Sequence, residues 1–151
     1  MAYNLKKFNK VSSTLEPGES FLAGAPALPP GGVGRSMVGG ALGGAVGVIA
    51  AGSGSATAGA FELPGRFTLA LTDRRIMVFK PDPWLGRPKK LVGSIPLADV
   101  AGAAFTESGA VSKRAAVSLR NGTSLDVEVQ KGIGRAWMEH FIEQVNARIA
   151  A

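Results

Sequence analysis

The chain has 151 residues, of which 46% are hydrophobic, and this length and composition fit one globular domain with a core of its own. Its 17 lysines and arginines outnumber 11 acidic residues and are scattered, so a net charge of +6 tolerates anionic membranes or nucleic acid without requiring either. The absence of cysteine excludes disulfides, thiol nucleophiles and cysteine metal sites.

The first 30 residues predict a short helix followed by a strand. Leu5, Phe8 and Val11 recur at three-residue steps, which indicates an amphipathic helix within residues 3–15. Glu16-Pro17-Gly18-Glu19 ends this helix, because proline cannot continue its hydrogen bonding. Residues 20–28 are then expected to form the first strand. The N-terminal residues lack the apolar stretch of a signal peptide, so we expect a cytoplasmic location, with the inner face of the membrane as an alternative.

Residues 36–61 form an uncharged run dominated by glycine and alanine. On a helix, the four-residue spacing of Gly39, Gly43 and Gly47, with Gly40 and Gly44 beside them, would produce a groove that another backbone can approach closely. We expect this glycine row to assemble copies of the chain or to contact a membrane. A disordered linker is the alternative. The run has few strongly apolar residues, and a single membrane crossing would separate the first strand from the rest of the domain.

After residue 65, the alternation of apolar and polar residues predicts six further strands. The last two flank Asn121-Gly122, the favoured two-residue hairpin turn. A loop of turn formers and cations is expected at residues 81–90. The six expected strands cover residues 66–71, 75–80, 91–95, 100–106, 115–119 and 125–129.

Beyond Gly132 the apolar period changes from two residues to 3.6, which predicts a terminal amphipathic helix. About seven strands followed by one helix predict a mainly β fold of the α+β class, a bent seven-stranded antiparallel sheet or partial barrel capped by the helix. The apolar stripe of the helix comprises Trp137, Met138, Phe141, Ile142, Val145 and Ile149.

Two local patterns support a family resemblance. Leu15-Glu16-Pro17-Gly18-Glu19 precedes the first strand, and Ala70-Leu71-Thr72-Asp73-Arg74-Arg75-Ile76 is similar to a "L-T-[D/N]-x-R" hairpin. With these two patterns, the chain resembles the bacterial pleckstrin-homology-like family. Two later segments fit the same resemblance: Ile95-Pro96-Leu97-Ala98-Asp99-Val100 and Asn121-Gly122. The resemblance implies a seven-stranded bent sheet capped by a helix, no enzymatic activity, and a role in self-association or in adapting other proteins to membranes. Residues 36–61 depart from the family pattern, because they form an insertion between the first two strands. We expect the whole chain, residues 1–151, to form a single domain.

No residue pattern indicates catalysis, a metal or a cofactor. His140, the sole histidine, is expected on the solvated side of the terminal helix beside Glu139 and Glu143, without the partner that acid–base catalysis needs. Asp73 is expected to bond the backbone of its own turn, although Asp73 with Arg74 and Arg75 could also contact an anion. The glycine run lacks the Lys-Ser/Thr of a phosphate-binding loop.

The loop at residues 81–90 is the candidate binding element. Trp84 is followed by Arg87, Lys89 and Lys90, a combination typical of an anchor at an anionic membrane surface. The alternative is a tryptophan packed against the sheet edge. We therefore predict a non-enzymatic scaffold or adaptor that forms homo-oligomers through the glycine row, or alternatively a peripheral membrane adaptor that binds anionic lipid through the Trp84 loop. A protein partner is compatible with both, whereas nucleic-acid binding rests on net charge alone.

Overall fold

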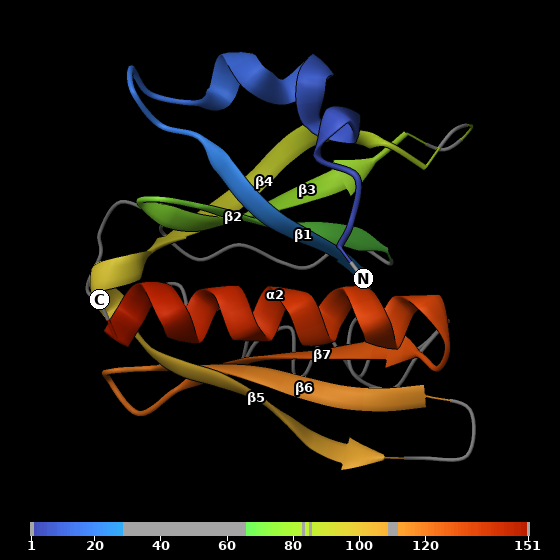
Figure 1. Cartoon of the computed structure of the whole chain (residues 1–151), viewed down its shortest axis with the longest axis vertical. Coiled ribbons are helices and arrows are strands. Elements are labelled where there is room, and N and C mark those ends of the chain that lie inside the picture. The colour runs from blue at the N-terminus through green and yellow to red at the C-terminus, as the bar shows by residue number, and fades with distance from the viewer. Residues whose placement is uncertain (1, 29–65, 83, 85, 109–111, 151) are drawn as a thin grey trace.

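Seven antiparallel strands and a long C-terminal helix form the fold in the computed structural model, which describes residues 2–28, 66–82, 84, 86–108 and 112–150. The strands lie in two sheets, in the order β1-β2-β3-β4 and β5-β6-β7, and the predicted α+β architecture is confirmed (Figure 1). The elements are η1 (Leu5–Thr14), β1 (Phe21–Ala27), β2 (Phe67–Thr72), β3 (Arg75–Pro81), β4 (Pro88–Pro96), η2 (Leu97–Asp99), β5 (Val100–Ser108), β6 (Ser112–Leu119), β7 (Ser124–Gln130) and α2 (Ile133–Ala150).

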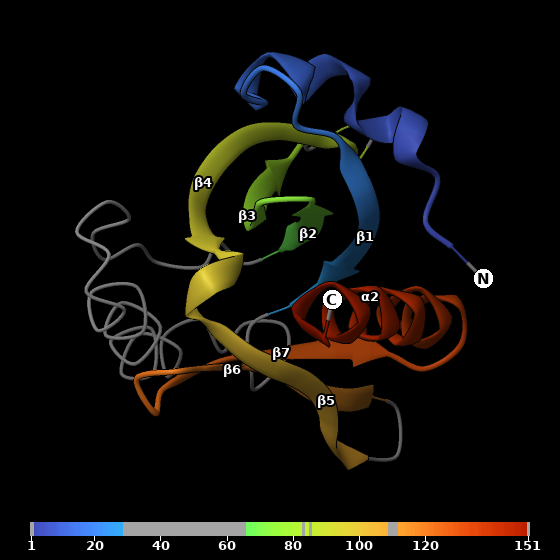
Figure 2. The same ribbon diagram turned by 60° about the vertical axis from the view of Figure 1, so that its left-hand side comes forward.

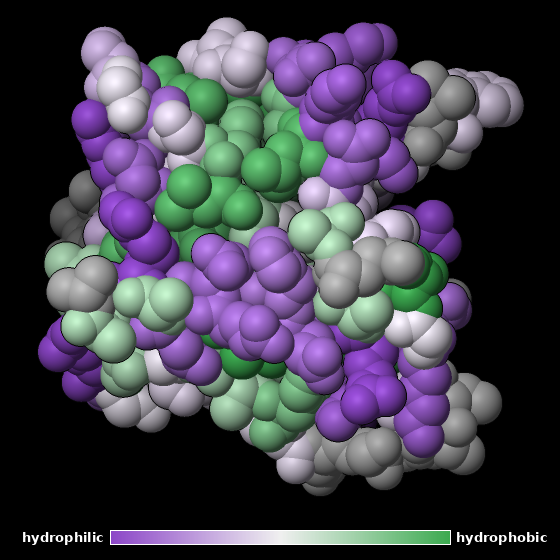
Figure 3. Space-filling view, in the orientation of Figure 1, coloured by the Kyte–Doolittle hydropathy of each residue, from purple (hydrophilic) through white to green (hydrophobic). Residues whose placement is uncertain are grey.

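The first sheet is covered on both faces. Its inner face contributes to the main core, while η1 packs on the outer face, where Phe8 and Val11 belong to a second buried cluster with Met77 and Phe79. The element η1 is a 3-10 helix, and the three-residue spacing of its apolar side chains matches three residues per turn. A Cβ at Gly24 would lie 2.8 Å from the Phe8 ring, so glycine permits this close packing. Figure 3 shows hydrophobic side chains still visible on this face between η1 and α2.

Helix α2 lies along the open side between the two sheets (Figure 2). It packs mainly on β1 and also contacts β5 and β7, and Met138, Phe141 and Val145 are buried. The sheets meet at a backbone bridge, where Leu28 and Glu128 exchange two hydrogen bonds of 2.8 Å. Asn146 of α2 donates to and accepts from the backbone of Ala103, which satisfies edge groups of β5. The helix and both sheets therefore share one core.

Three sequence expectations need correction. The loop after β3 is shorter than predicted, because β3 continues to Pro81 and β4 begins at Pro88, so that Lys89 and Lys90 lie in a strand. Proline and cations fit there because β4 is an edge strand. Asp73 accepts a hydrogen bond from the distant Ser20 N–H at 3.0 Å, and does not bond its own turn. His140 is the third correction.

His140 is half-buried rather than solvated. Its Nδ1 is buried and has no hydrogen-bond partner within the part of the chain that the structure describes. The solvated face of α2 is narrower than the sequence predicts because the helix contacts strands of both sheets.

Candidate functional site

The two sequence patterns that carry the family resemblance, residues 15–19 and 70–76, lie side by side in the structure around the buried carboxylate of Glu19. Glu19 is buried, and its Oε2 accepts hydrogen bonds from the Thr72 hydroxyl at 2.6 Å and from Arg75 Nε at 3.0 Å. Its Oε1 accepts from Arg75 Nη2 at 3.0 Å and from the Glu16 N–H at 2.8 Å. Arg75 also donates to the carbonyl of Thr14, at the end of η1. The network therefore joins η1 and the start of β1 to the β2–β3 hairpin.

Electrostatics favour the charged form of Glu19. Burial alone raises the pKa of this carboxyl, but hydrogen bonds from Arg75, Thr72 and Glu16, together with the charge of Arg75, outweigh burial and hold the pKa at about 2. The same ion pair raises the pKa of Arg75. The pair is thus charged near neutral pH.

Arg74 completes this structural cluster. It forms an ion pair of 3.1 Å with Glu16 and donates to the carbonyl of Pro17 at 2.9 Å. The adjacent Gly18 has a φ of +82°, which glycine adopts at low cost. Since Arg74 and Arg75 both bind carboxylates of their own chain, the alternative of an anion contact at this turn is not supported.

The residues that the structure describes also contain no group of three metal-ligating side chains.

The predicted binding loop is the exposed tip of the β3–β4 hairpin. Trp84 is 90% exposed, so the alternative of a tryptophan packed on the sheet edge is wrong. Asp82 shapes the turn: its carboxylate accepts from the Trp84 N–H at 2.7 Å, and its own N–H donates to the Arg87 carbonyl at 2.7 Å. Gly86 takes a φ of +69° in this turn. The hairpin projects from the body of the molecule in Figure 1, so that its tip is accessible to a flat surface.

Four exposed cations surround this tip. Arg87, Lys89 and Lys90 were predicted from the sequence, and the structure adds Lys80, which is paired directly across the strands with Lys90. None of the four forms an ion pair with any residue that the structure describes. Because like charges directly opposite each other in a sheet are unfavourable, the Lys80–Lys90 pair is not explained by stability. We call Lys80, Trp84, Arg87, Lys89 and Lys90 the basic hairpin.

The glycine row is the second element that the sequence predicts to have a function. Gly39, Gly40, Gly43, Gly44 and Gly47 lie outside the described residues, so their role stays a prediction. Among the helices that the structure describes, none is long and apolar enough to cross a membrane.

Comparison with solved structures supports the architecture. The chain is similar to a pleckstrin homology domain from Shewanella amazonensis SB2B, with a TM-score of 0.50, 12% sequence identity, and coverage of 94% of this chain and 96% of that one. No family model and no curated protein sequence matches the chain. At this identity the likeness concerns the fold and not the activity. The chain therefore has a pleckstrin-homology-like fold, in which two antiparallel sheets pack with a C-terminal helix.

Proposed function

We propose that the protein is a non-catalytic adaptor module that docks on anionic membrane surfaces through the basic hairpin. The observation that carries this proposal is the 90% exposure of Trp84 at a hairpin tip beside four exposed cations, which form no ion pair within the described part of the chain. An indole ring is favoured at the level of lipid headgroups, and each nearby lysine or arginine adds about 1 kcal/mol of attraction to an anionic leaflet. The fold, which is common among binding modules, is consistent with this role.

A nucleic-acid ligand fits the same surface less well. Single strands are bound by aromatic side chains that stack successive bases along a basic groove. Within the described residues, the hairpin offers one exposed aromatic side chain, Trp84, at a projecting tip. A tip of this shape suits insertion into a flat, anionic interface.

Removing the hairpin cations is expected to weaken vesicle binding. Changing Arg87, Lys89 and Lys90 together to serine removes roughly 3 kcal/mol of attraction, which corresponds to a loss on the order of 100-fold in affinity. The measurement is co-sedimentation with phosphatidylglycerol-containing vesicles at low salt. The folded domain should keep its melting temperature, because all three side chains are exposed.

A matched variant separates this local effect from net charge. Lys10, Arg120 and Arg135 are exposed cations on other elements, and changing them to serine removes the same charge. This control is expected to retain most of the vesicle affinity. Equal losses in the two triple variants, or no vesicle binding by the parent protein, would refute docking by the hairpin.

We also propose self-association through the glycine row, which is supported by its four-residue spacing in the sequence alone. A leucine at Gly43 would fill the groove and separate whatever packs there, whereas it would favour an isolated helix because leucine is the better helix former. Gly43→Leu is therefore expected to give a smaller species by light scattering, with the sheets still folded. An unchanged mass would exclude the groove as the contact.

A further inference from the structure

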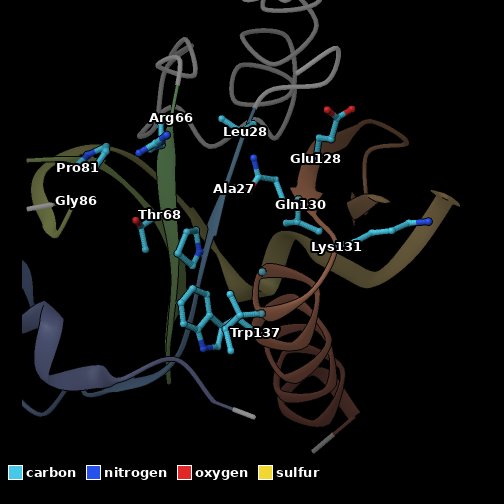
Figure 4. Close-up of a pocket in the computed structure, with 14 residues that line it drawn as sticks. Ala27, Leu28, Arg66, Thr68, Pro81, Gly86, Glu128, Gln130, Lys131 and Trp137 are labelled. Atoms are coloured by element: carbon cyan, nitrogen blue, oxygen red, sulfur yellow. The ribbon is translucent and has the colours of Figure 1, made fainter. Parts of the chain in front are cut away.

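A cavity of about 310 Å³ opens where the ends of several elements converge (Figure 4). Arg66, immediately before β2, and Thr68, near the start of β2, lie on one wall, and Gln130, at the end of β7, lies opposite. The ring of Trp137 from α2 lies at the base, and Leu28 lies at the end of β1. The cavity is thus built from both sheets and the helix, which fixes its shape.

The lining of the cavity combines apolar and polar side chains, with slightly more apolar than polar surface. Its apolar part includes Ala27, Leu28, the Trp137 ring and Ile133, which is 48% exposed. The volume lies at the lower end of the range of roughly 300–1,000 Å³ for small-ligand sites. A ligand with a short hydrocarbon chain would fit this lining.

Of the two cations in the lining, Arg66 and Lys131, Arg66 has no partner among the residues that the structure describes. Arg66 forms no ion pair or side-chain hydrogen bond with the residues that the structure describes, and the same holds for the side chains of Thr68 and Gln130. Glu128, the acidic residue in the lining, is already paired with Arg114 at 3.4 Å. The Lys131 side chain points away from Arg66 and Trp137 in Figure 4. The rim therefore offers one positive charge with two neutral hydrogen-bonding groups.

We propose that this cavity binds a small amphiphile with one negative charge, such as a medium-chain carboxylate, with the carboxylate at Arg66 and the hydrocarbon chain against Trp137. A single guanidinium can bind one carboxylate through two parallel hydrogen bonds. A polyphosphorylated headgroup would require more cations than this rim supplies. The inference goes beyond the proposed function and does not depend on vesicle binding.

The cavity contains its own spectroscopic reporter. The chain has two tryptophans, and Trp84 lies on the projecting hairpin, outside the lining. In a Trp84→Phe variant, the remaining emission comes from Trp137, which contacts the Tyr3 ring edge-on at 5.2 Å. A hydrocarbon chain against Trp137 is expected to exclude water and shift its emission to shorter wavelength.

The test titrates this variant with four probes: octanoate, octanamide, acetate and inorganic phosphate. Octanoate is expected to give a saturable shift, with an affinity about tenfold above that of octanamide, which has the same size but no charge. Acetate and phosphate should not compete. Octanoate and octanamide binding equally, competition by phosphate, or the absence of a saturable shift would each overturn the proposal.

Variants at the rim identify the residue responsible. Arg66→Gln is expected to reduce octanoate affinity about tenfold and leave octanamide affinity unchanged, while Arg66→Lys, which keeps the charge, retains part of the binding. Arg66 is exposed, so both proteins should fold, and circular dichroism checks this. Arg120→Gln removes a cation outside the cavity and should leave octanoate binding unchanged. An equal loss in Arg120→Gln would contradict a local role for Arg66.

Discussion

Replacing Phe141 with alanine is expected to lower the free energy of unfolding by about 3–5 kcal/mol, because the ring is fully buried and its removal leaves a cavity. Phe141 belongs to the core shared by α2 and the two sheets, so the loss weakens the packing of the helix against the rest of the domain. For a domain of this length, the melting temperature should fall by roughly 10 °C or more. Thermal unfolding followed by circular dichroism measures this shift.

A control on the same helix isolates the packing effect. Glu143 is exposed, and alanine is a good helix former, so Glu143→Ala should change the melting temperature little. A Phe141→Ala protein that melts within a degree or two of the parent would show that α2 does not stabilise the sheets.

Replacing Glu19 with glutamine is expected to lower the free energy of unfolding by about 3 kcal/mol at pH 7. The pKa of Glu19 is about 2 in the folded protein against 4.5 in a model compound, and each unit of difference corresponds to about 1.36 kcal/mol. The glutamine also leaves Arg75 without its carboxylate partner in a largely buried setting. Urea unfolding of the parent and variant at pH 7 measures the difference.

The pH dependence provides a second readout of Glu19. Because folding lowers the pKa of this carboxyl, its contribution is complete above about pH 5 and is lost as the pH falls towards 2. The stability difference between the parent and Glu19→Gln should therefore shrink over this window. Glu16→Gln is the matched control, since its ion pair with Arg74 is exposed and worth about 1 kcal/mol or less. A constant difference from pH 7 to pH 2 would contradict the role of the ionised Glu19.

Local sequence patterns were sufficient to predict the strands and the helix, but not how the strands divide into sheets. Side-chain alternation identifies β6 and β7, because one of their faces is buried and the Asn121-Gly122 turn joins them. The contact between Leu28 and Glu128, by contrast, joins residues a hundred positions apart. No local pattern encodes such a pairing, since it depends on how the two sheets pack around α2.

For the candidate sites too, the sequence identifies residues that are neighbours along the chain, but not residues that come together only on folding. Trp84 and its neighbouring cations are adjacent in the sequence, so composition alone identified them. Lys80 was missed because its relation to Lys90 depends on the β3–β4 register. Arg66 immediately precedes β2, Gln130 ends β7 and Trp137 lies in α2, so that the three meet only in the folded chain. The structural roles of Arg74 and Arg75 were likewise visible only once Glu16 and Glu19 were placed beside them.

Trp84 emission in the presence of vesicles is the most direct test of docking by the basic hairpin. A Trp137→Phe variant leaves Trp84 as the sole tryptophan, and in solution its emission should be that of a solvated indole because the side chain is 90% exposed. With vesicles of phosphatidylglycerol and phosphatidylcholine at low salt, the emission should shift to shorter wavelength as the ring enters the headgroup region. Pure phosphatidylcholine should produce no shift, and added salt should reverse the effect. Emission that stays unchanged on anionic vesicles, whether or not the protein binds them, would contradict docking through this hairpin.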